Sequence, residues 1–335
     1  MKRLLSILII ALAFASCRNE REDVEPNVER SPILFGEMDT RTLDAPVVGD
    51  EFGVFAYKNG GVDGTPEASI WANLLNQERV YWKEEDGNEG WTYDNIQFWE
   101  LDRTFQFFAF HPYEEDFVTP VSNGTTDTGY ELTVVTDQEA QYDLMTAGYT
   151  QRTQTGVAFP SQVSLDFNHE FVKVNVEVQQ NFDKNPTQAF CVNYMSLSNI
   201  WSKGVLRIDG LGAGATRTWS FPSATPLKFE YEDANNTPLA TDYKVLLRPT
   251  PMLLIPQSTG SINFTMNYKY APTKVDGEWA WEPRTANINL PTGTWKAGTE
   301  VLYSITLYED NEIVFTKVSV APWGTNQSGG TIIIK

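Results

Sequence analysis

Histidine and cysteine are nearly absent from this chain, since its 335 residues include two of each. His111 and His169 lie far apart, and neither an HExxH nor a CxxC spacing occurs, which excludes the common zinc patterns. A Gly-rich phosphate loop after a strand and a GxSxG nucleophile elbow are also missing. We therefore expect no catalytic residue, no metal and no cofactor, and we predict that the protein is not an enzyme. The acidic stretch Glu84–Glu89 lacks the spacing of an EF-hand loop, and a weakly bound loop Ca²⁺ is the alternative there.

Basic residues are fewer than acidic ones: the chain has 25 Lys and Arg and 44 Asp and Glu, which gives a net charge of -19. The field of such a chain repels phosphate backbones, so nucleic acid is not an expected partner. Because carboxylates are plentiful, a paired acid and base stays open on sequence alone. Their spread along the chain is nevertheless that of a solvated surface.

The sequence also lacks helical periodicity. Apolar residues rarely recur at helical spacing, and only Ala68–Gln77 has a weak helical pattern. Short runs of Val, Thr, Ile and Tyr separated by Gly, Asn, Asp and Pro predict an all-β fold of antiparallel sandwiches instead, with a hairpin over Val301–Val320. The expected strands are Ser31–Glu37, Glu51–Tyr57, Val80–Trp82, Thr92–Phe98, Arg103–Phe110, Glu131–Thr136, Tyr142–Ala147, Gln162–Val178, Phe190–Asn199, Gly204–Ile208, Tyr243–Leu247, Met252–Ile255, Ser261–Tyr270, Thr285–Leu290, Val301–Tyr308, Ile313–Val320 and Thr331–Lys335.

Long apolar runs are confined to the first residues, where Lys2 and Arg3 precede the apolar run Leu4–Phe14. This is the pattern of an export signal and is too short to span a bilayer. With Ala15 and Ser16 before Cys17, its ending resembles the lipobox of bacterial lipoproteins, although Phe14 stands where Leu is usual. Residues 1–17 are therefore predicted to be a lipoprotein signal peptide, with Cys17 lipidated and anchored in the outer membrane. The alternative is ordinary secretion with Cys17 incidental.

The segment that follows, Arg18–Arg30, is highly charged and has only two apolar side chains, so we expect a flexible tether. Acidic residues soon after Cys17 resemble the surface-export signal of Bacteroidetes lipoproteins. Cys191 is the only other cysteine, so with Cys17 lipidated it has no thiol partner for an internal disulfide, and we expect it to be a small buried residue.

The stretch Leu165–Val178 alternates like a strand, but its phase changes midway. Apolar residues occupy odd positions up to Phe171 and even positions from Val172. A shift by one residue turns every side chain to the other face. We interpret this as the passage of the chain from one core to another, which divides it into domains at 31–161 and 162–335. The alternative is one long bulged strand.

Aromatic residues are abundant, with ten Trp and fourteen Tyr. Trp71, Trp82, Trp91 and Trp99 fall among the first strands. Core and rim packing is the simple interpretation; an exposed platform that stacks on sugar rings is the other.

Short motifs in a fixed order are similar to those of the fimbrillin family of Bacteroidetes, the lipoprotein subunits of type V pili. They cover the whole chain: the lipobox at Cys17, Ile33–Phe35 followed by Thr40 and Arg41, Gly53–Tyr57, Tyr142–Ala147, Leu165-x-Phe167-x-His169 with Lys173, Trp295-x-Ala297-Gly298 before Tyr303-x-Ile305-x-Leu307, and Val318-x-Val320-x-Pro322-Trp323. The resemblance implies two transthyretin-like antiparallel β-sandwich domains in tandem.

The resemblance also implies an assembly route by donor-strand exchange. A trypsin-like protease cuts the surface-exposed lipoprotein after a basic residue and removes the first strand. The C-terminal strand of another pilin subunit, the same or a related one, then fills the vacated groove. Mapped onto this chain, the cut is at Arg41, the displaced strand holds Ile33, Leu34 and Phe35, and the donor strand is Thr331, Ile332, Ile333, Ile334 and Lys335.

Each of these assignments has a plainer counterpart. Arg30 is a competing cut site, and a cut there would leave the first strand in place. Arg41 could instead be a solvated cation in a loop. Thr331–Lys335 could be a last strand that packs within its own subunit. The sequence therefore predicts a stalk or tip subunit of an adhesive pilus, at the outer membrane and then in the fimbrium, with a host protein or glycan as a further partner. The alternative is a surface lipoprotein that binds glycans and never polymerises.

Overall fold

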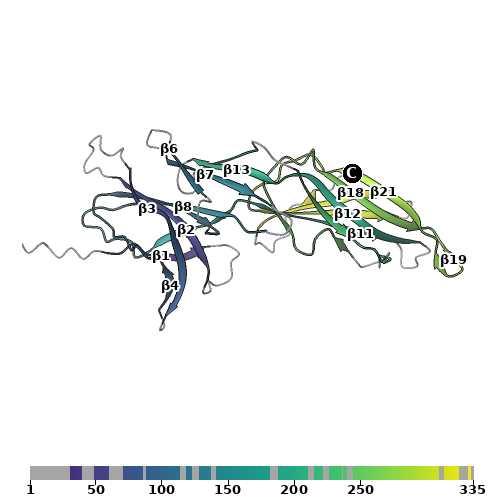
Figure 1. The fold of residues 1–335 in the computed structure, drawn as a ribbon, viewed down its shortest axis with the longest axis horizontal. Coiled ribbons are helices and arrows are strands. Elements are labelled where there is room, and N and C mark those ends of the chain that lie inside the picture. Colours follow the sequence, from purple (N-terminus) through teal and green to yellow (C-terminus); the bar gives the residue numbers. More distant parts are fainter. Residues whose placement is uncertain are drawn as a thin grey trace, which may run out of the picture.

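The structure, a computed structural model of the chain, describes residues 31–39, 49–59, 71–85, 88–113, 118–122, 128–136, 141–181, 188–209, 215–221, 226–235, 237–239, 244–308, 313–323 and 331–332. In this part of the chain every regular element is a β-strand (Figure 1). The prediction of an all-β fold is confirmed. No helix among these residues is long and apolar enough to cross a membrane.

The strands of the first half are β1 (Phe35–Asp39), β2 (Glu51–Asn59), β3 (Trp71–Glu85), β4 (Asn88–Thr92), β5 (Thr104–His111), β6 (Val118–Ser122), β7 (Thr128–Val135), β8 (Met145–Arg152), β9 (Val163–Asp166) and β10 (Asn168–His169). Those of the second half are β11 (Val172–Asn181), β12 (Ala189–Trp201), β13 (Lys203–Asp209), β14 (Thr216–Ser220), β15 (Pro226–Glu232), β16 (Val245–Leu246), β17 (Met252–Leu254), β18 (Asn263–Ala271), β19 (Lys274–Val275), β20 (Glu278–Trp279), β21 (Glu282–Asn289), β22 (Thr299–Tyr308), β23 (Ile313–Pro322) and β24 (Thr331–Ile332).

The weak helical pattern of Ala68–Gln77 is a wrong prediction. From Trp71 onward this stretch is the start of β3, which pairs with β2 from Trp71 to Tyr81. Ladder hydrogen bonds to a neighbouring strand outweigh a helix propensity that amounts to only a few tenths of a kcal/mol per residue.

The first half is organised around an eight-stranded sheet in the order β10-β8-β5-β2-β3-β4-β1-β9. Strand β5 explains why this sheet is buried on both faces. Phe105 and Phe107 enter one core, whereas Phe108 and Phe110 enter a second core on the opposite face. Successive side chains of a strand point to opposite faces, so a strand with aromatics at nearly every position needs a covering layer on each side.

The layer on the second face comes from both halves of the chain. A four-stranded sheet in the order β14-β13-β7-β6 joins β6 and β7 to the β13–β14 hairpin, in a register that pairs Lys203 with Val135 and Asp209 with Gly129. Strands β9 and β10 likewise pair with β1 and β8. Hydrogen-bonded strand pairing therefore joins residues on both sides of the expected domain boundary between residues 161 and 162. The division into domains at 31–161 and 162–335 stays a prediction.

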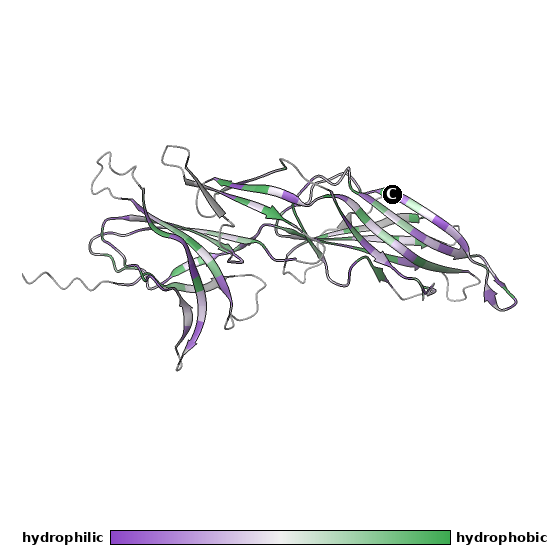
Figure 2. Cartoon of the chain, in the orientation of Figure 1, coloured by the Kyte–Doolittle hydropathy of each residue, from purple (hydrophilic) through white to green (hydrophobic). Residues whose placement is uncertain are grey.

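The rest of the second half is a two-sheet sandwich at the other end of an elongated molecule (Figure 1). One sheet has the order β16-β11-β22-β23-β24, with β17 also paired to β11, and the other has the order β15-β12-β18-β21. The β22–β23 hairpin predicted over Val301–Val320 is present. Hydrophobic and hydrophilic residues alternate along many of these strands (Figure 2), as expected for sheets with one buried face.

Two pairings are parallel, β1 with β9 and β11 with β22. The sequence pattern predicts only antiparallel neighbours, because it reports which face of a strand is buried and not which distant strand lies beside it. Strands joined by short turns pair antiparallel, whereas parallel neighbours need a long connection, as between β1 and β9.

The phase change in Leu165–Val178 marks the passage between cores. Leu165 and Phe167 lie in the first core, Phe171 lies in the second, and Val172 begins the run that enters the core of the C-terminal sandwich. Strand β9 ends at Asp166 and β11 begins at Val172, so the segment is not one long bulged strand.

The close contact between β2 and β5 gives a test of this packing. A Cβ added at Gly53 would lie 2.1 Å from the ring of Phe110, which is fully buried and has no room to move. We expect Gly53→Ala to lower the free energy of unfolding by about 1–3 kcal/mol, as overpacked cores do. Chemical denaturation is the measurement. Gly90→Ala is the control, since a Cβ there would meet nothing within 4 Å; an equal loss in both variants would contradict the packing.

Candidate functional site

The first described segment of the chain is built into the interior of the large sheet. Strand β1 lies between β4, to which it is antiparallel, and β9, to which it is parallel. Just before it, the Ile33 amide donates to Gln97 O (2.8 Å), the Trp99 amide to Ser31 O (3.0 Å) and the Val163 amide to Leu34 O (2.7 Å). The segment therefore completes the hydrogen bonding of a neighbour on each side.

Its side chains are part of the core of this sheet. Ile33 is fully buried and Phe35 is 2% exposed, whereas Leu34 is half-buried on the other face. The Phe35 ring makes edge contacts with Phe52 and Phe107, at centroid distances of 5.8 and 6.2 Å. Each such side chain contributes about 1.5–3 kcal/mol by its burial.

Tyr93 holds the same segment from the side of the chain that follows β4. Its hydroxyl donates to Ile33 O (2.9 Å) and accepts from the Gln97 amide (3.0 Å). Burial raises the pKa of the Tyr93 phenol above its usual value, which keeps the hydroxyl available as a donor. The leading segment is thus fixed by backbone pairs, by two apolar side chains and by one buried phenol.

The predicted site residues are distributed over separate parts of the molecule. Ile33, Leu34 and Phe35 lie in the first sheet. Thr331 and Ile332 form β24, which pairs with Ser319 and Val318 of β23 in the C-terminal sandwich. Cys17, Arg41 and Ile333–Lys335 fall outside the described residues. Within one chain, the expected displaced strand and the expected donor strand are not neighbours.

A groove of about 580 Å³ lies beside β23 in the C-terminal sandwich. Val318 and Val320 form one wall, and Trp295 and Tyr303 form the floor. The Trp295 indole donates to the Tyr303 hydroxyl (3.0 Å), and burial raises the pKa of Tyr303. The sandwich is therefore open to solvent next to the strand that carries β24.

A second groove, of about 520 Å³, lies at the end of the first sheet where β3 and β5 begin and β8 ends. It is lined by Leu74, Gln97, Phe98, Trp99, Glu100, Leu101 and Phe159. We call this region the N-terminal pole. Sequence reasoning missed it because Thr92–Phe98 was expected to be a strand. In the structure β4 ends at Thr92, and only an isolated bridge between Phe98 and Pro32 follows.

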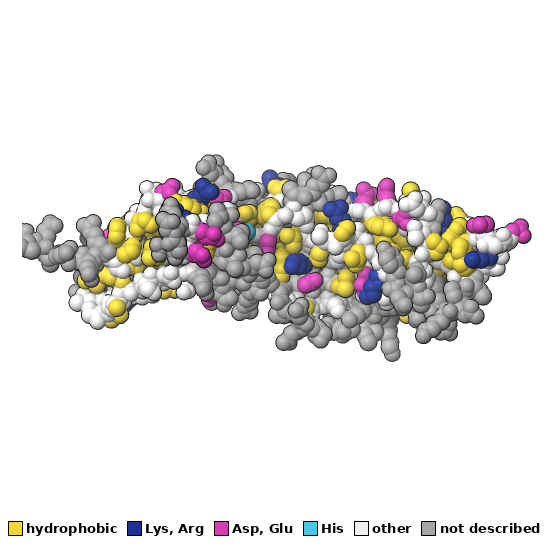
Figure 3. Space-filling model, turned by 90° about the horizontal axis from the view of Figure 1, so that it is seen from below, with side chains coloured by type: hydrophobic (Ala, Val, Ile, Leu, Met, Phe, Trp, Pro, Cys, Tyr) yellow, Lys and Arg dark blue, Asp and Glu magenta, His cyan; other side chains and the backbone are white. Residues whose placement is uncertain are grey.

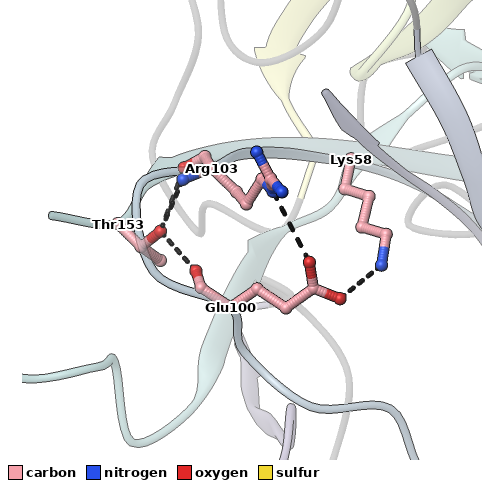
Figure 4. A network of polar contacts seen from close by, with 4 residues as sticks. All are labelled: Lys58, Glu100, Arg103 and Thr153. Atoms are coloured by element: carbon pink, nitrogen blue, oxygen red, sulfur yellow. Dashed lines mark hydrogen bonds and ion pairs between the residues drawn. The ribbon is translucent and has the colours of Figure 1, made fainter. Parts of the chain in front are cut away.

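The loops of the N-terminal pole are held by a compact polar network (Figure 4). The Glu100 carboxylate pairs with Lys58 and with Arg103. The Thr153 hydroxyl donates to Glu100 O (2.6 Å) and accepts from the Arg103 amide (3.0 Å). The hydrogen bond from Lys58 holds the pKa of the Glu100 carboxyl below its usual value, so the pair is ionic at neutral pH.

The junction between the two halves contains the sequence motif residue His169. Its Nδ1 lies 3.0 Å from Asp143 Oδ1, and its ring stacks on Trp323 with centroids 4.0 Å apart. Lys173 also lies over the Trp323 ring, with Nζ 4.4 Å from the ring centroid. His169 is therefore a hydrogen-bonded packing residue of the junction.

The other predicted packing residues are also buried. Cys191 is a free, fully buried thiol whose pKa is raised by burial. Trp91 and Trp99 are 5% and 3% exposed, so core packing is confirmed for these two tryptophans and they form no open platform. Among the residues that the structure describes, no group of three or more His, Cys, Asp or Glu could hold a metal ion.

The leading segment gives a second test. We expect Phe35→Ala to lower the free energy of unfolding by about 3–5 kcal/mol, because a buried ring is replaced by a cavity. Leu34→Ala, on the half-buried face, is the matched control and should cost less. Urea unfolding of the uncut protein compares the two; equal effects would mean that Phe35 does not belong to the core.

Comparisons with known proteins agree with this architecture. A search of curated protein sequences found no match. Among solved structures, a fimbrial protein from Bacteroides vulgatus superposes with a TM-score of 0.59 at 18% identity, over 81% of this chain and 92% of that one, which shows a shared fold. A protein from Bacteroides uniformis proposed to act in cell adhesion has a TM-score of 0.49 at 18% identity, over 89% and 99% of the two chains.

The family comparison tests the resemblance drawn from the short motifs. The model of the family described as fimbrillin-like matches residues 40–323, which is most of the 335-residue chain. That resemblance is therefore confirmed, and the chain belongs to the fimbrillin-like family.

Proposed function

We propose that this protein is a stalk or tip subunit of an adhesive cell-surface pilus, assembled by protease-triggered donor-strand exchange. In this proposal it is exported as an outer-membrane lipoprotein through Cys17 and later becomes part of the fimbrium. The observation that carries the proposal is the position of the leading segment. It is the first described part of the chain, yet it is an interior strand of the first sheet, with a strand on each side.

Loss of this segment would create a binding site for another strand. Strands β4 and β9 would be left about 9.5 Å apart, twice the usual spacing, with unpaired backbone groups facing each other. The pockets of Ile33 and Phe35 would open to water between them. Such a slot binds an extended segment through main-chain hydrogen bonds and alternate apolar side chains.

The connectivity supports Arg41 as the cut. Strand β1 ends at Asp39 and β2 begins at Glu51, so Arg41 lies in the connection between them. A cut there separates β1 from the rest of the chain and leaves β2 whole. A cut after Arg30 would precede β1 and leave it covalently attached.

The proposed donor is the segment Thr331–Lys335 of a neighbouring subunit. It is rich in β-branched residues, and a Gly- and Ser-containing stretch precedes it. Its described part, β24, pairs with Ser319 and Val318 of β23.

The proposal is tested with purified precursor and a trypsin-like protease. We expect N-terminal shortening to Thr42, followed by ladders on a gel that resist mild denaturation. Arg41→Ala should block both, whereas Arg30→Ala, the control, should block neither. N-terminal sequencing and size analysis are the measurements. A product that is cut at Arg41 but stays monomeric would contradict strand exchange; an uncut monomer that binds polysaccharide would support the alternative of a glycan-binding surface lipoprotein.

A further inference from the structure

The N-terminal pole carries exposed apolar side chains that the fold does not use. Phe98, Leu101 and Val157 are 39%, 43% and 61% exposed, whereas most large apolar side chains of the described residues are buried. Phe98 and Leu101 line the groove of about 520 Å³ together with Leu74 and Phe159. Hydrophobic side chains also lie on the surface of the end that holds the first sheet in the space-filling view (Figure 3). Clustered exposed apolar side chains mark a site that contacts another protein or a membrane.

The loops that carry these side chains are bonded to each other. The Asp102 carboxylate accepts from the Thr155 amide (3.1 Å) and from the Thr155 hydroxyl (2.9 Å). Leu101 precedes Asp102 directly, and Val157 follows Thr155 by two residues, so these bonds keep the two apolar residues close in space. Loops that are already fixed lose little conformational entropy when they bind.

The charge in the groove wall is compensated. Glu100 is the charged residue among those that line the groove, and its carboxylate pairs with both Lys58 and Arg103 (Figure 4). The net charge of -19 opposes contact between the protein and an anionic lipid surface. A side of contact must therefore be low in uncompensated negative charge, and the lining of this groove meets that condition.

The pole is also where the described chain begins. Ser31 O accepts from the Trp99 amide (3.0 Å), and Pro32 forms a bridge with Phe98. Trp99 and Phe98 both line the groove. The first described residues therefore lie directly against the apolar groove.

Strand directions place this start of the chain at the end of the first sheet away from the junction. Strand β8 begins at Met145, which pairs with the junction residue His169. It ends at Arg152, which pairs with Thr104 at the pole. The pole and the C-terminal sandwich thus lie at opposite ends of β8.

The residues that precede the described structure connect the pole to the predicted lipid. The segment 18–30 lies between Cys17 and Ser31, and its thirteen residues span at most about 47 Å even when fully extended. In the proposed function Cys17 carries the acyl chains. The pole is then the part of the described structure that is joined to the bilayer by the shortest stretch of chain, which argues for a lipid surface as the partner of its apolar side chains.

We propose that, in the uncut precursor, the N-terminal pole inserts Phe98, Leu101 and Val157 into the interfacial region of the bilayer that holds the Cys17 anchor. This inference rests on the lipidation of Cys17 in the proposed function. A tethered surface acts at a high effective concentration, so a small apolar contact is enough to orient the protein. A cut at Arg41 removes the tether and leaves only this small contact, which then releases the subunit from the membrane.

The test holds the protein on vesicles and asks which end touches the lipid. A hexahistidine tag replaces residues 1–17, and the vesicles contain phosphatidylethanolamine, phosphatidylglycerol and a nickel-chelating lipid. The buried Cys191 is then the remaining native thiol. Leu101→Cys or Val275→Cys, at positions that are 43% and 57% exposed, carries a bimane label. Lipids brominated on their acyl chains quench a label that enters the bilayer.

We expect brominated lipids to reduce the emission of the label at Leu101. The label at Val275, which lies in the β19–β20 hairpin at the far end of the molecule (Figure 1), should keep its emission. Val157→Asp combined with the label at Leu101 should abolish the quenching. Val135→Asp is the matched control, since Val135 is 53% exposed on β7, and it should leave the quenching unchanged. Thermal unfolding shows whether each variant is folded.

Vesicle-bound protein with an unquenched label at Leu101 would overturn the inference. Equal quenching at Leu101 and Val275 would also overturn it, because the molecule would then lie flat on the lipid. A change in the Leu101 emission that follows protein concentration without vesicles would overturn it in favour of a second copy. These outcomes leave the proposed function standing, because the tag takes the place of the lipid. A precursor that stays in the membrane fraction of cells after Cys17→Ser would overturn the proposed anchor and this inference together.

Discussion

The insertion of the leading segment between β4 and β9 is the constraint on which the first half of the structure depends. Ile33 and Phe35 fill the core below the sheet, and the backbone around them satisfies neighbours on both sides. Without this segment the sheet would consist of a six-stranded part and a detached β9. The connection from this segment to β2 contains Arg41.

The two halves of the molecule solve the problem of sheet edges differently. In the first half, β1 closes the gap between β4 and β9 from within the chain. In the C-terminal sandwich, β24 pairs with β23, and a groove floored by Trp295 and Tyr303 lies beside β23. A strand with large buried side chains, such as the one that holds Ile33 and Phe35, is of the kind whose removal would leave a slot for another strand.

Much of this architecture follows from the sequence. Alternation identifies most of the long strands, and the phase change at Phe171 locates the passage between cores, because burial of one face dictates period two. Partner choice does not follow: nothing in Lys203–Asp209 indicates that it pairs with Gly129–Val135, some 75 residues earlier in the chain. The N-terminal pole was missed for a related reason. Phe98 looks like a strand residue, and its exposure is decided by loops from Leu101 and Val157 that only tertiary structure brings together.

The β13–β14 hairpin gives the molecule a mechanical property. The chain crosses the junction near Phe171, and the ladder from Lys203–Asp209 to Gly129–Val135 ties the same two halves a second time. These strands run roughly along the long axis (Figure 1), so a pull on the two ends loads the ladder in shear. Its hydrogen bonds then share the load and break together, whereas a ladder pulled across its strands opens one bond at a time. Under tension, this ladder therefore strengthens the junction between the two halves of the molecule.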